Sequence, residues 1–228
     1  MSSIEAAIFD LDGVLIDSEH VWDEVREKLA RERGGRWHDQ AQADMMGMSS
    51  IEWSRYMHDV IGLGEAPGEI NAEVVRRMGA RYAEHLPLVD GAVAAVRRPA
   101  RAYRLGLASS SNRPLIDTVL SASGLAPLFE ATVSAEEVER GKPAPDVFCE
   151  AARRLGVAPE RCAAIEDSGN GIRAAHAAGM RVIAIPNRRY PPPAEALALA
   201  DIVLDSLAGL TPATVRELPE ASGPSARL

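Results

Sequence analysis

Lysine and cysteine are both scarce in this chain of 228 residues. Of its 25 lysines and arginines, only Lys28 and Lys142 are lysines, and its two cysteines, Cys149 and Cys162, lie apart in the sequence. Cysteines spaced in this way form no metal-ligand pattern. We therefore interpret them as reduced thiols of the core, in a reducing compartment, rather than as partners in a disulfide.

Excess positive charge and long apolar runs are also lacking. The formal net charge is −8 at pH 7, which argues against a general nucleic-acid binder or a protein that binds anionic membranes. No apolar run is long enough to span a membrane, and residues 1–10 show no basic region followed by an apolar run, so no signal peptide is evident. The cytoplasm is the expected location, with neither nucleic acid nor a membrane as a partner.

Two aspartates, one residue apart, follow the first apolar segment. Residues 4–9 are apolar and partly branched apart from Glu5, which predicts a buried parallel strand. In extended backbone Asp10 and Asp12 point to the same face, so both carboxylates can address one point in space. Like charges held together favour a cation between them, and Mg²⁺ takes hard oxygen ligands. One carboxylate could then act as a nucleophile and the other as a general acid and base.

Two other interpretations of this segment stay open at this point. It could be a strand-to-loop turn whose aspartates face water, or it could open a calcium-binding loop. The calcium loop is disfavoured because the apolar residues Val14, Leu15 and Ile16 follow where further ligands would be needed.

The rest of the chain divides into a helical stretch and a stretch of alternating strands and helices. Residues 18–86 carry apolar positions at helical spacing, with Ser18 expected to cap the first helix and no strand expected. The later strands are expected at 104–108, 129–133, 162–165, 181–185 and 201–204. This pattern predicts an α/β fold, a doubly wound parallel sheet formed by residues 1–17 and 87–228, into which residues 18–86 are inserted as a helical domain.

Polar residues come directly after several of the predicted strands. Ser109 follows one strand, Glu166 and Asp167 follow another, and ligands of such sheets bind at this edge. Each of these residues could instead be a helix cap. That interpretation replaces a ligand site only if it holds for all of them at the same edge of the sheet, which is a stronger requirement than for any one of them. Lys142, in the loop 141–145, is a rare lysine in a chain that otherwise uses arginine, and a compact ammonium can sit between phosphate and carboxylates.

Four segments together resemble the motifs of the haloacid dehalogenase superfamily, in its β-phosphoglucomutase-like branch of phosphatases and mutases. In chain order they are Asp10-Leu11-Asp12-Gly13-Val14-Leu15, Leu107-Ala108-Ser109-Ser110-Ser111-Asn112, Gly141-Lys142-Pro143-Ala144-Pro145-Asp146 and Ile165-Glu166-Asp167-Ser168. Their order and spacing fit that family, and the helical stretch is similar in position and character to its type 1 cap. The resemblance implies a Rossmann-like core with an inserted all-helical cap.

The resemblance also implies Mg²⁺-dependent phosphoryl transfer through an aspartyl-phosphate, from a small phosphorylated metabolite, by a monomer or small homo-oligomer. The implied catalytic residues are Asp10 as the nucleophile, Asp12 as the acid and base, Ser109 and Lys142. The implied metal ligands are Asp10, the backbone carbonyl of Asp12, and Asp167, with Glu166 nearby. The implied substrate-binding residues are Glu19, Trp22, Ser110 and Asn112.

Hydrolysis is expected rather than the intramolecular transfer of a β-phosphoglucomutase. Trp22 stands where the mutases resembled here carry a histidine, and Ser50 stands where they carry an arginine that grips the distal phosphate. Trp22 could instead be a core residue of the cap. A dehalogenase is disfavoured because Asp12 is present, and a signalling receiver domain because it needs no long helical insertion. A non-catalytic regulatory relative that binds a partner through its cap is disfavoured because no catalytic position is substituted.

Overall fold

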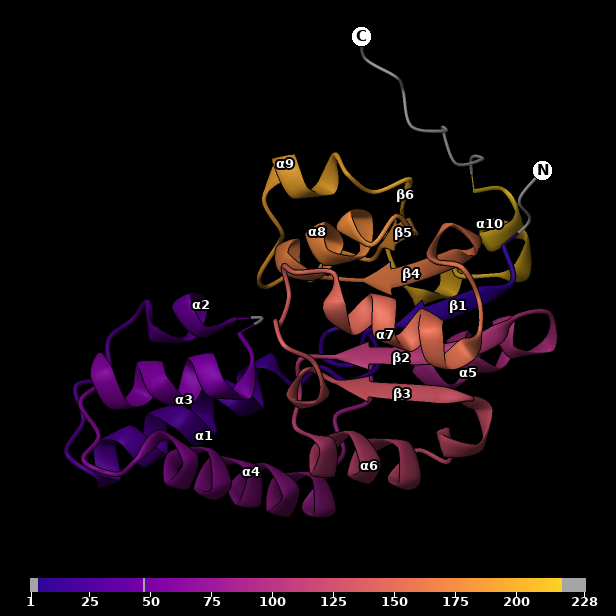
Figure 1. The fold of residues 1–228 in the computed structure, drawn as a ribbon. Coiled ribbons are helices and arrows are strands. Elements are labelled where there is room, and N and C mark those ends of the chain that lie inside the picture. The colour runs from indigo at the N-terminus through magenta and orange to yellow at the C-terminus, as the bar shows by residue number, and fades with distance from the viewer. Residues whose placement is uncertain (1–3, 47, 219–228) are drawn as a thin grey trace, which may run out of the picture.

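A parallel sheet of six strands forms the centre of the computed structural model, which describes residues 4–46 and 48–218 (Figure 1). The strands are β1 (Ala6–Phe9), β2 (Arg104–Ser109), β3 (Ala131–Ser134), β4 (Cys162–Glu166), β5 (Arg181–Ala184) and β6 (Ile202–Val203). Their order is β3-β2-β1-β4-β5-β6, and every neighbouring pair is parallel. The α/β fold predicted from the sequence is confirmed.

Both faces of this sheet are buried. Within β1, Ala7 and Phe9 enter one core and Ala6 and Ile8 enter the other. Burial on two sides explains why the strand is continuously apolar rather than alternating. The helices that cover the Phe9 side are α5 (Ala92–Arg97), α6 (Arg113–Ala122) and α10 (Pro212–Arg216). Those that cover the Ile8 side are α7 (Asp146–Leu155) and α8 (Gly169–Ala177), with the short α9 (Ala194–Leu197) against α8.

The third strand starts later than the sequence predicts. It was expected to begin at Phe129, but β3 begins at Ala131. Phe129 instead follows a short 3₁₀ turn, Ala126–Leu128, and its ring packs edge-on against the ring of Phe9, with centroids 6.0 Å apart. Because the ring is held in the core from this position, the chain aligns with β2 only two residues later.

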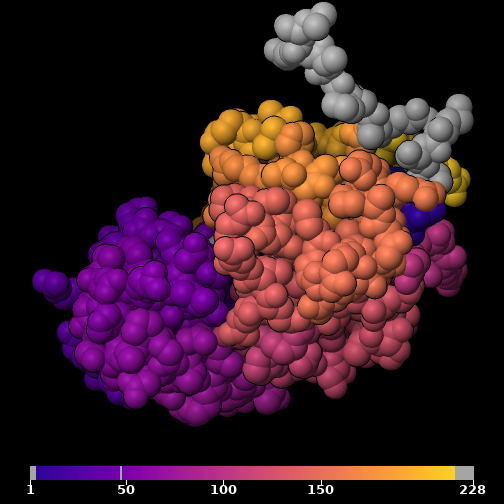
Figure 2. Space-filling model, viewed as in Figure 1, coloured from indigo at the N-terminus to yellow at the C-terminus, as the bar shows by residue number. Residues whose placement is uncertain are grey.

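Among the residues that the structure describes, four helices lie between β1 and α5 in the sequence and form a lobe beyond one end of the sheet (Figure 1). They are α1 (Glu19–Glu32), α2 (Ala41–Met45), α3 (Ser50–Asp59) and α4 (Pro67–Glu84). The strand arrows point toward this lobe, which we call the cap, so the cap faces the carboxyl ends of the strands. In the space-filling view the cap stands beside the body that carries the sheet and touches it along one side (Figure 2). In the part of the chain that the structure describes, no helix is long and apolar enough to cross a membrane.

Candidate active site

The three central strands end at one level, which brings the polar residues after them together. Phe9, the last residue of β1, pairs with Leu107 of β2 and with Ile165 of β4. The backbone N–H of Asp10 still donates to the carbonyl of Ile165 at 2.9 Å. The first and fourth strands are neighbours at the place where strand order reverses, and folds of this kind bind their ligands there.

Gly13 lets the loop after the two aspartates turn back against Asp167. Its φ is +84°, in the left-handed region that glycine adopts without strain. A Cβ atom at this position would lie 1.9 Å from a carboxylate oxygen of Asp167, so any other residue would push that side chain away. The Asp167 carboxylate therefore lies directly against the loop that carries Asp12.

Lys142 reaches the same place from the loop before α7. Its ammonium donates to Asp10 Oδ1 at 2.5 Å, to Glu166 Oε1 at 2.6 Å and to the carbonyl of Ala108 at 3.0 Å. Its Nζ also lies 4.9 Å from the ring centroid of Phe148. Burial acts to lower the pKa of Lys142, but the charges of Asp10 and Glu166 outweigh burial, so the pKa is raised above its usual value. The ammonium stays charged and ties two buried carboxylates together.

Replacement of Lys142 by methionine is expected to lower the free energy of unfolding by about 3 to 5 kcal/mol, because it leaves Asp10 and Glu166 buried without their cation. Urea unfolding at pH 7 measures this change. The matched control is Lys28→Met, which removes the other lysine from an exposed position and should change the free energy of unfolding by less than about 0.5 kcal/mol. Equal effects of the two substitutions would contradict this account of the ion cluster.

Three carboxylates gather beside that ammonium. Ligand oxygens of Asp10, Glu166 and Asp167 all lie within 4.8 Å of one another, and all three residues are buried. Burial raises the pKa of Asp10 to about 8 even though Lys142 acts in the opposite direction. Burial also raises the pKa of Asp167 well above its usual value, and the neighbouring carboxylates add to the effect. Three carboxylates gathered at one point offer the hard oxygen ligands that suit a divalent cation such as Mg²⁺.

Glu166 is oriented by the start of α8. Its Oε2 accepts from the backbone N–H of Asp167 at 3.0 Å and of Ser168 at 3.1 Å, while its Oε1 accepts from Lys142. A Cβ at Gly171 would lie 1.8 Å from this carboxylate, so the glycine leaves the space that Glu166 fills. Ser168 caps the helix through its hydroxyl, which accepts from the N–H of Gly171 at 3.1 Å. Both carboxylate oxygens of Glu166 are thus hydrogen-bonded to other groups of the protein, whereas Asp10 and Asp167 line the cavity described below.

The carboxylate of Asp12 lies among donors rather than among the other acids. Ser18 Oγ donates to its Oδ1 at 2.5 Å and Trp22 Nε1 donates to the same oxygen at 3.1 Å. Ser111 Oγ donates to its Oδ2 at 2.6 Å, and Ser109 Oγ makes a longer contact of 3.5 Å with that oxygen. Ser18 is the N-cap residue of α1, as predicted, but its side chain makes no bond to the helix N-terminus. The hydroxyl instead donates its proton to the carboxylate of Asp12.

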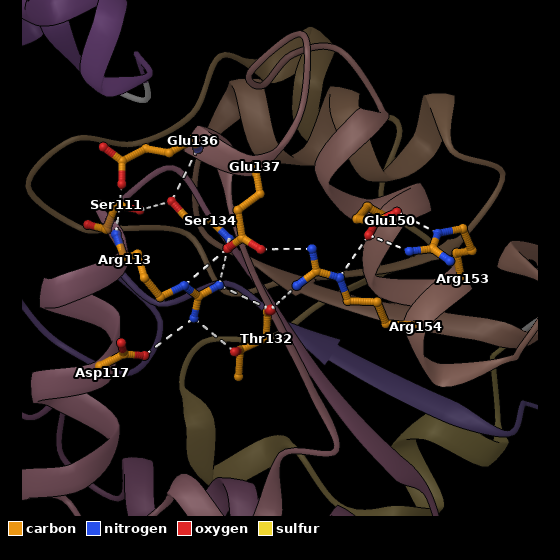
Figure 3. Close-up of polar contacts among 10 residues, drawn as sticks. All are labelled: Ser111, Arg113, Asp117, Thr132, Ser134, Glu136, Glu137, Glu150, Arg153 and Arg154. Carbon is orange, nitrogen blue, oxygen red and sulfur yellow. Dashed lines mark hydrogen bonds and ion pairs between the residues drawn. The ribbon is translucent and has the colours of Figure 1, made fainter.

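The loop after β2 is anchored by the end of β3. Ser134 Oγ donates to the carbonyl of Ser111 at 2.7 Å, and the backbone N–H of Ser111 donates to Ser109 Oγ at 3.0 Å. Figure 3 shows the arginines of α6 and α7 converging on the same strand end, where Arg113 and Arg154 both donate to Glu137. These contacts fix the loop on which the predicted phosphate-binding residues lie.

The four predicted substrate-binding residues occupy different places. Glu19, Trp22 and Ser110 line the cavity between the cap and the strand ends. Asn112 does not: its Nδ2 donates to Asn71 of α4 at 3.1 Å and to Glu136 at 2.7 Å, where the cap touches the core. Ser50, at the position of the mutase arginine, also bonds to Glu136 there, at 3.2 Å.

The cavity has a volume of about 50 Å³, and its two walls differ in character. Asp10, Asp12, Lys142 and Asp167 belong to the core wall. The cap wall contains Glu19, Trp22, Arg26, Trp53 and three methionines. Burial, with the charge of Asp12, raises the pKa of Glu19 to about 7.

Trp22 is buried in the cap and also lines the cavity, so both positions weighed for it from the sequence apply, while its contact with a substrate stays a prediction. It is buried against Trp53, with ring centroids 5.9 Å apart, and its indole N–H bonds to Asp12. Arg26, Trp53 and Ser111 also line the cavity, although they were not predicted as site residues. The available signal for Arg26 was its spacing of four residues after Trp22, which puts both on one face of a helix.

Comparisons with known proteins show the family to which this chain belongs. The sequence profile of the haloacid dehalogenase-like hydrolases matches residues 4–179. Hexitol phosphatase B of Escherichia coli (strain K12) is 34% identical over 230 residues, which cover 91% of this chain and 95% of that protein. The crystal structure of CbbY from Rhodobacter sphaeroides in complex with phosphate has a TM-score of 0.83 at 29% identity and covers 94% of this chain and 100% of that one. The structure of β-phosphoglucomutase from Clostridium difficile has a TM-score of 0.81 at 25% identity, over 94% and 96% of the two chains. This chain belongs to the haloacid dehalogenase-like hydrolases.

Proposed function

We propose that this protein is a Mg²⁺-dependent phosphatase that hydrolyses small phosphate monoesters, such as sugar phosphates, through an aspartyl-phosphate on Asp10. The observation that carries the proposal is the placement of Asp10 at the cavity, with its carboxylate bonded to Lys142. The phosphatase name of a relative that aligns along most of the chain supports the same reaction class.

In the first step, a bond forms between a carboxylate oxygen of Asp10 and phosphorus, and the bond from phosphorus to the leaving oxygen breaks. Asp12 donates a proton to that leaving oxygen. Lys142 holds Asp10 in place and offsets the negative charge that gathers around phosphorus. Ser109 and the backbone N–H that follows it bind the phosphate oxygens.

In the second step, Asp12 takes a proton from a water molecule, and the water oxygen attacks phosphorus. The bond from phosphorus to Asp10 breaks, which releases inorganic phosphate and restores the carboxylate. The donors around Asp12, Ser18, Trp22 and Ser111, hold its carboxylate in one orientation between the two steps.

The residues that would hold Mg²⁺ are Asp10, the backbone carbonyl of Asp12, and Asp167. Glu166 lies beside them but directs its oxygens to Lys142 and to backbone N–H groups. When bound, Mg²⁺ shields the negative charge of the transferring phosphoryl group.

Intramolecular transfer by a mutase is the alternative reaction, and two residues of the cap favour hydrolysis. Trp22 occupies the place of the mutase histidine, and its indole can donate to Asp12 but cannot take up a proton. Ser50 is bonded to Glu136 at the junction of cap and core, so this position offers no cation for a distal phosphate. A bisphosphate intermediate would be held weakly, and water would react first.

Release of phosphate from p-nitrophenyl phosphate and from a panel of sugar phosphates should require Mg²⁺ and stop in excess chelator. Ca²⁺ should support the reaction poorly, because its looser and higher coordination disturbs an octahedral arrangement. Colorimetric detection of phosphate, with each cation added back after chelation, measures both effects.

Three outcomes would count against parts of the proposal. A full rate in excess chelator would contradict the metal site. Absence of phosphate release from every substrate would contradict the phosphatase itself. With β-glucose 1-phosphate and a trace of the 1,6-bisphosphate, formation of glucose 6-phosphate faster than free phosphate would identify a mutase.

A further inference from the structure

Ser111 connects the general acid and base of the site to the end of a neighbouring strand. Its hydroxyl donates to Asp12 Oδ2 at 2.6 Å, and its backbone N–H donates to Ser109 Oγ at 3.0 Å. Its carbonyl accepts from Ser134 Oγ at 2.7 Å (Figure 3). The position of the Ser111 hydroxyl, and with it the contact to Asp12, therefore depends on an anchor at the end of β3.

The hydroxyl of Ser134 is committed to this contact. A hydroxyl has one proton to donate, and Ser134 Oγ already accepts from the backbone N–H of Glu136 at 3.2 Å, which leaves its proton for the Ser111 carbonyl. Ser134 is fully buried, so bulk water does not compete for the bond. In the sheet Ser134 is paired with Ser109, so it stands beside the strand end from which the loop of Ser111 departs.

The end of β3 is itself fixed by an ion-pair network. The backbone N–H of Ser134 donates to Glu137 Oε1 at 3.0 Å, and the same carboxylate accepts from Arg113 Nε at 3.0 Å and from Arg154 Nη2 at 2.7 Å (Figure 3). Burial acts to raise the pKa of Glu137, but these donors outweigh burial and lower the pKa to about 2. The carboxylate therefore stays charged at neutral pH and keeps Ser134 in place.

The two oxygens of Asp12 are held by different parts of the protein. Oδ1 accepts from Ser18 Oγ and from Trp22 Nε1, at the start of the cap, whereas Oδ2 accepts from Ser111 of the core. A general acid and base must stay within hydrogen-bond reach of the oxygen that it serves. Loss of the contact from the core would leave the carboxylate free to turn about its bonds to the cap.

We propose that Ser134 is a positioning residue for phosphoryl transfer and acts through Ser111 to hold Asp12. The proposal rests on the phosphatase proposed above, in which Asp12 is the acid and base. Without the Ser134 hydroxyl, the buried Ser111 carbonyl loses its donor, which is costly for a buried polar group. The loop then moves to recover a partner and carries the Ser111 hydroxyl away from Asp12.

The kinetic test compares Ser134→Ala, Ser111→Ala and the double variant. Ser134→Ala removes a single oxygen atom and should lower kcat for a phosphate ester about 5- to 30-fold, with KM changed less than about threefold, because one buried hydrogen bond is lost. Ser111→Ala should cause a similar loss. The double variant should fall less than about twofold below Ser111→Ala, because the two residues act in series. Losses that multiply in the double variant would overturn the inference.

Ser123→Ala is the matched control for loss of a hydroxyl. Ser123 Oγ donates to the carbonyl of Val119 at 2.7 Å, the same length as the bond from Ser134 to Ser111, but this bond lies at the end of α6. The substitution should keep kcat within about twofold of the wild-type value. A loss as large as that of Ser134→Ala would show a general effect of stability and would contradict the positioning role.

The indole N–H of Trp22 reports the position of Asp12 without turnover. The three tryptophans give three indole signals in a ¹⁵N–¹H spectrum, and Trp22→Phe identifies the one from Trp22. In Ser134→Ala this signal should shift toward its position in Asp12→Ala, as it should in Ser111→Ala, while the Trp37 signal stays unchanged. An unchanged Trp22 signal in Ser134→Ala would overturn the inference even if the ester is hydrolysed. Failure of the phosphatase would show instead as no turnover of any ester, with the shift of the Trp22 signal still observed.

Discussion

Asp10→Asn is expected to abolish phosphate release while leaving the fold intact. An amide oxygen is a poor nucleophile, and removal of a nucleophile typically lowers kcat by about a thousandfold or more. Asparagine has the size of aspartate, and its amide oxygen can still accept from Lys142, which bonds to Asp10 at 2.5 Å. The hydrogen bond from the backbone N–H of residue 10 to the carbonyl of Ile165 involves only backbone atoms and should persist in the variant.

The measurement is the rate of phosphate release by purified Asp10→Asn, with mass spectrometry to exclude deamidation back to aspartate. Asp17→Asn is the matched control, because it removes an exposed carboxylate from the same connecting segment and should keep the wild-type rate. Survival of more than about a tenth of the wild-type rate in Asp10→Asn would reject Asp10 as the attacking group.

Asp12→Ala is expected to separate the two chemical steps. Without a proton donor, esters with poor leaving groups should react about a hundredfold to ten-thousandfold more slowly. An activated aryl phosphate leaves without protonation, so the first step should survive with that substrate. The second step should stall because no base takes the proton from water.

Stopped-flow recording of p-nitrophenol by Asp12→Ala should therefore show a burst of about one equivalent per enzyme, followed by slow turnover. The wild-type protein is the control. Because water is expected to attack its phospho-enzyme quickly, its release of p-nitrophenol should show no burst. A linear release at the wild-type rate in Asp12→Ala would contradict its role as the base.

The sheet and its functional edge could be predicted because both follow from local patterns. Strands buried on two faces are continuously apolar, and carboxyl ends of parallel strands meet at one edge. The placement of Asp10, Glu166 and Asp167 follows from these two facts, and Lys142 was indicated by the scarcity of lysine. The start of β3 was missed because the ring of Phe129 packs on Phe9, far away in the sequence.

Side-chain contacts across the cap could not be predicted in the same way. Ser18 looks like a helix cap in sequence, and only the fold shows that the Asp12 carboxylate lies within reach of its hydroxyl. The stacking of Arg26 on the ring of Trp53 could not be predicted, because only the fold shows that α3 brings Trp53 over it. Asn112 lies in the predicted loop, but α4 supplies Asn71 as a partner, away from the cavity.

The most direct test of the central claim is the mass of Asp12→Ala after rapid acid quench from an aryl phosphate. The intact protein should gain the mass of one phosphoryl group, and peptide mapping should place that group on Asp10. A burst of p-nitrophenol without the added mass, or with the phosphoryl group on a residue other than Asp10, would contradict an aspartyl-phosphate at the end of β1.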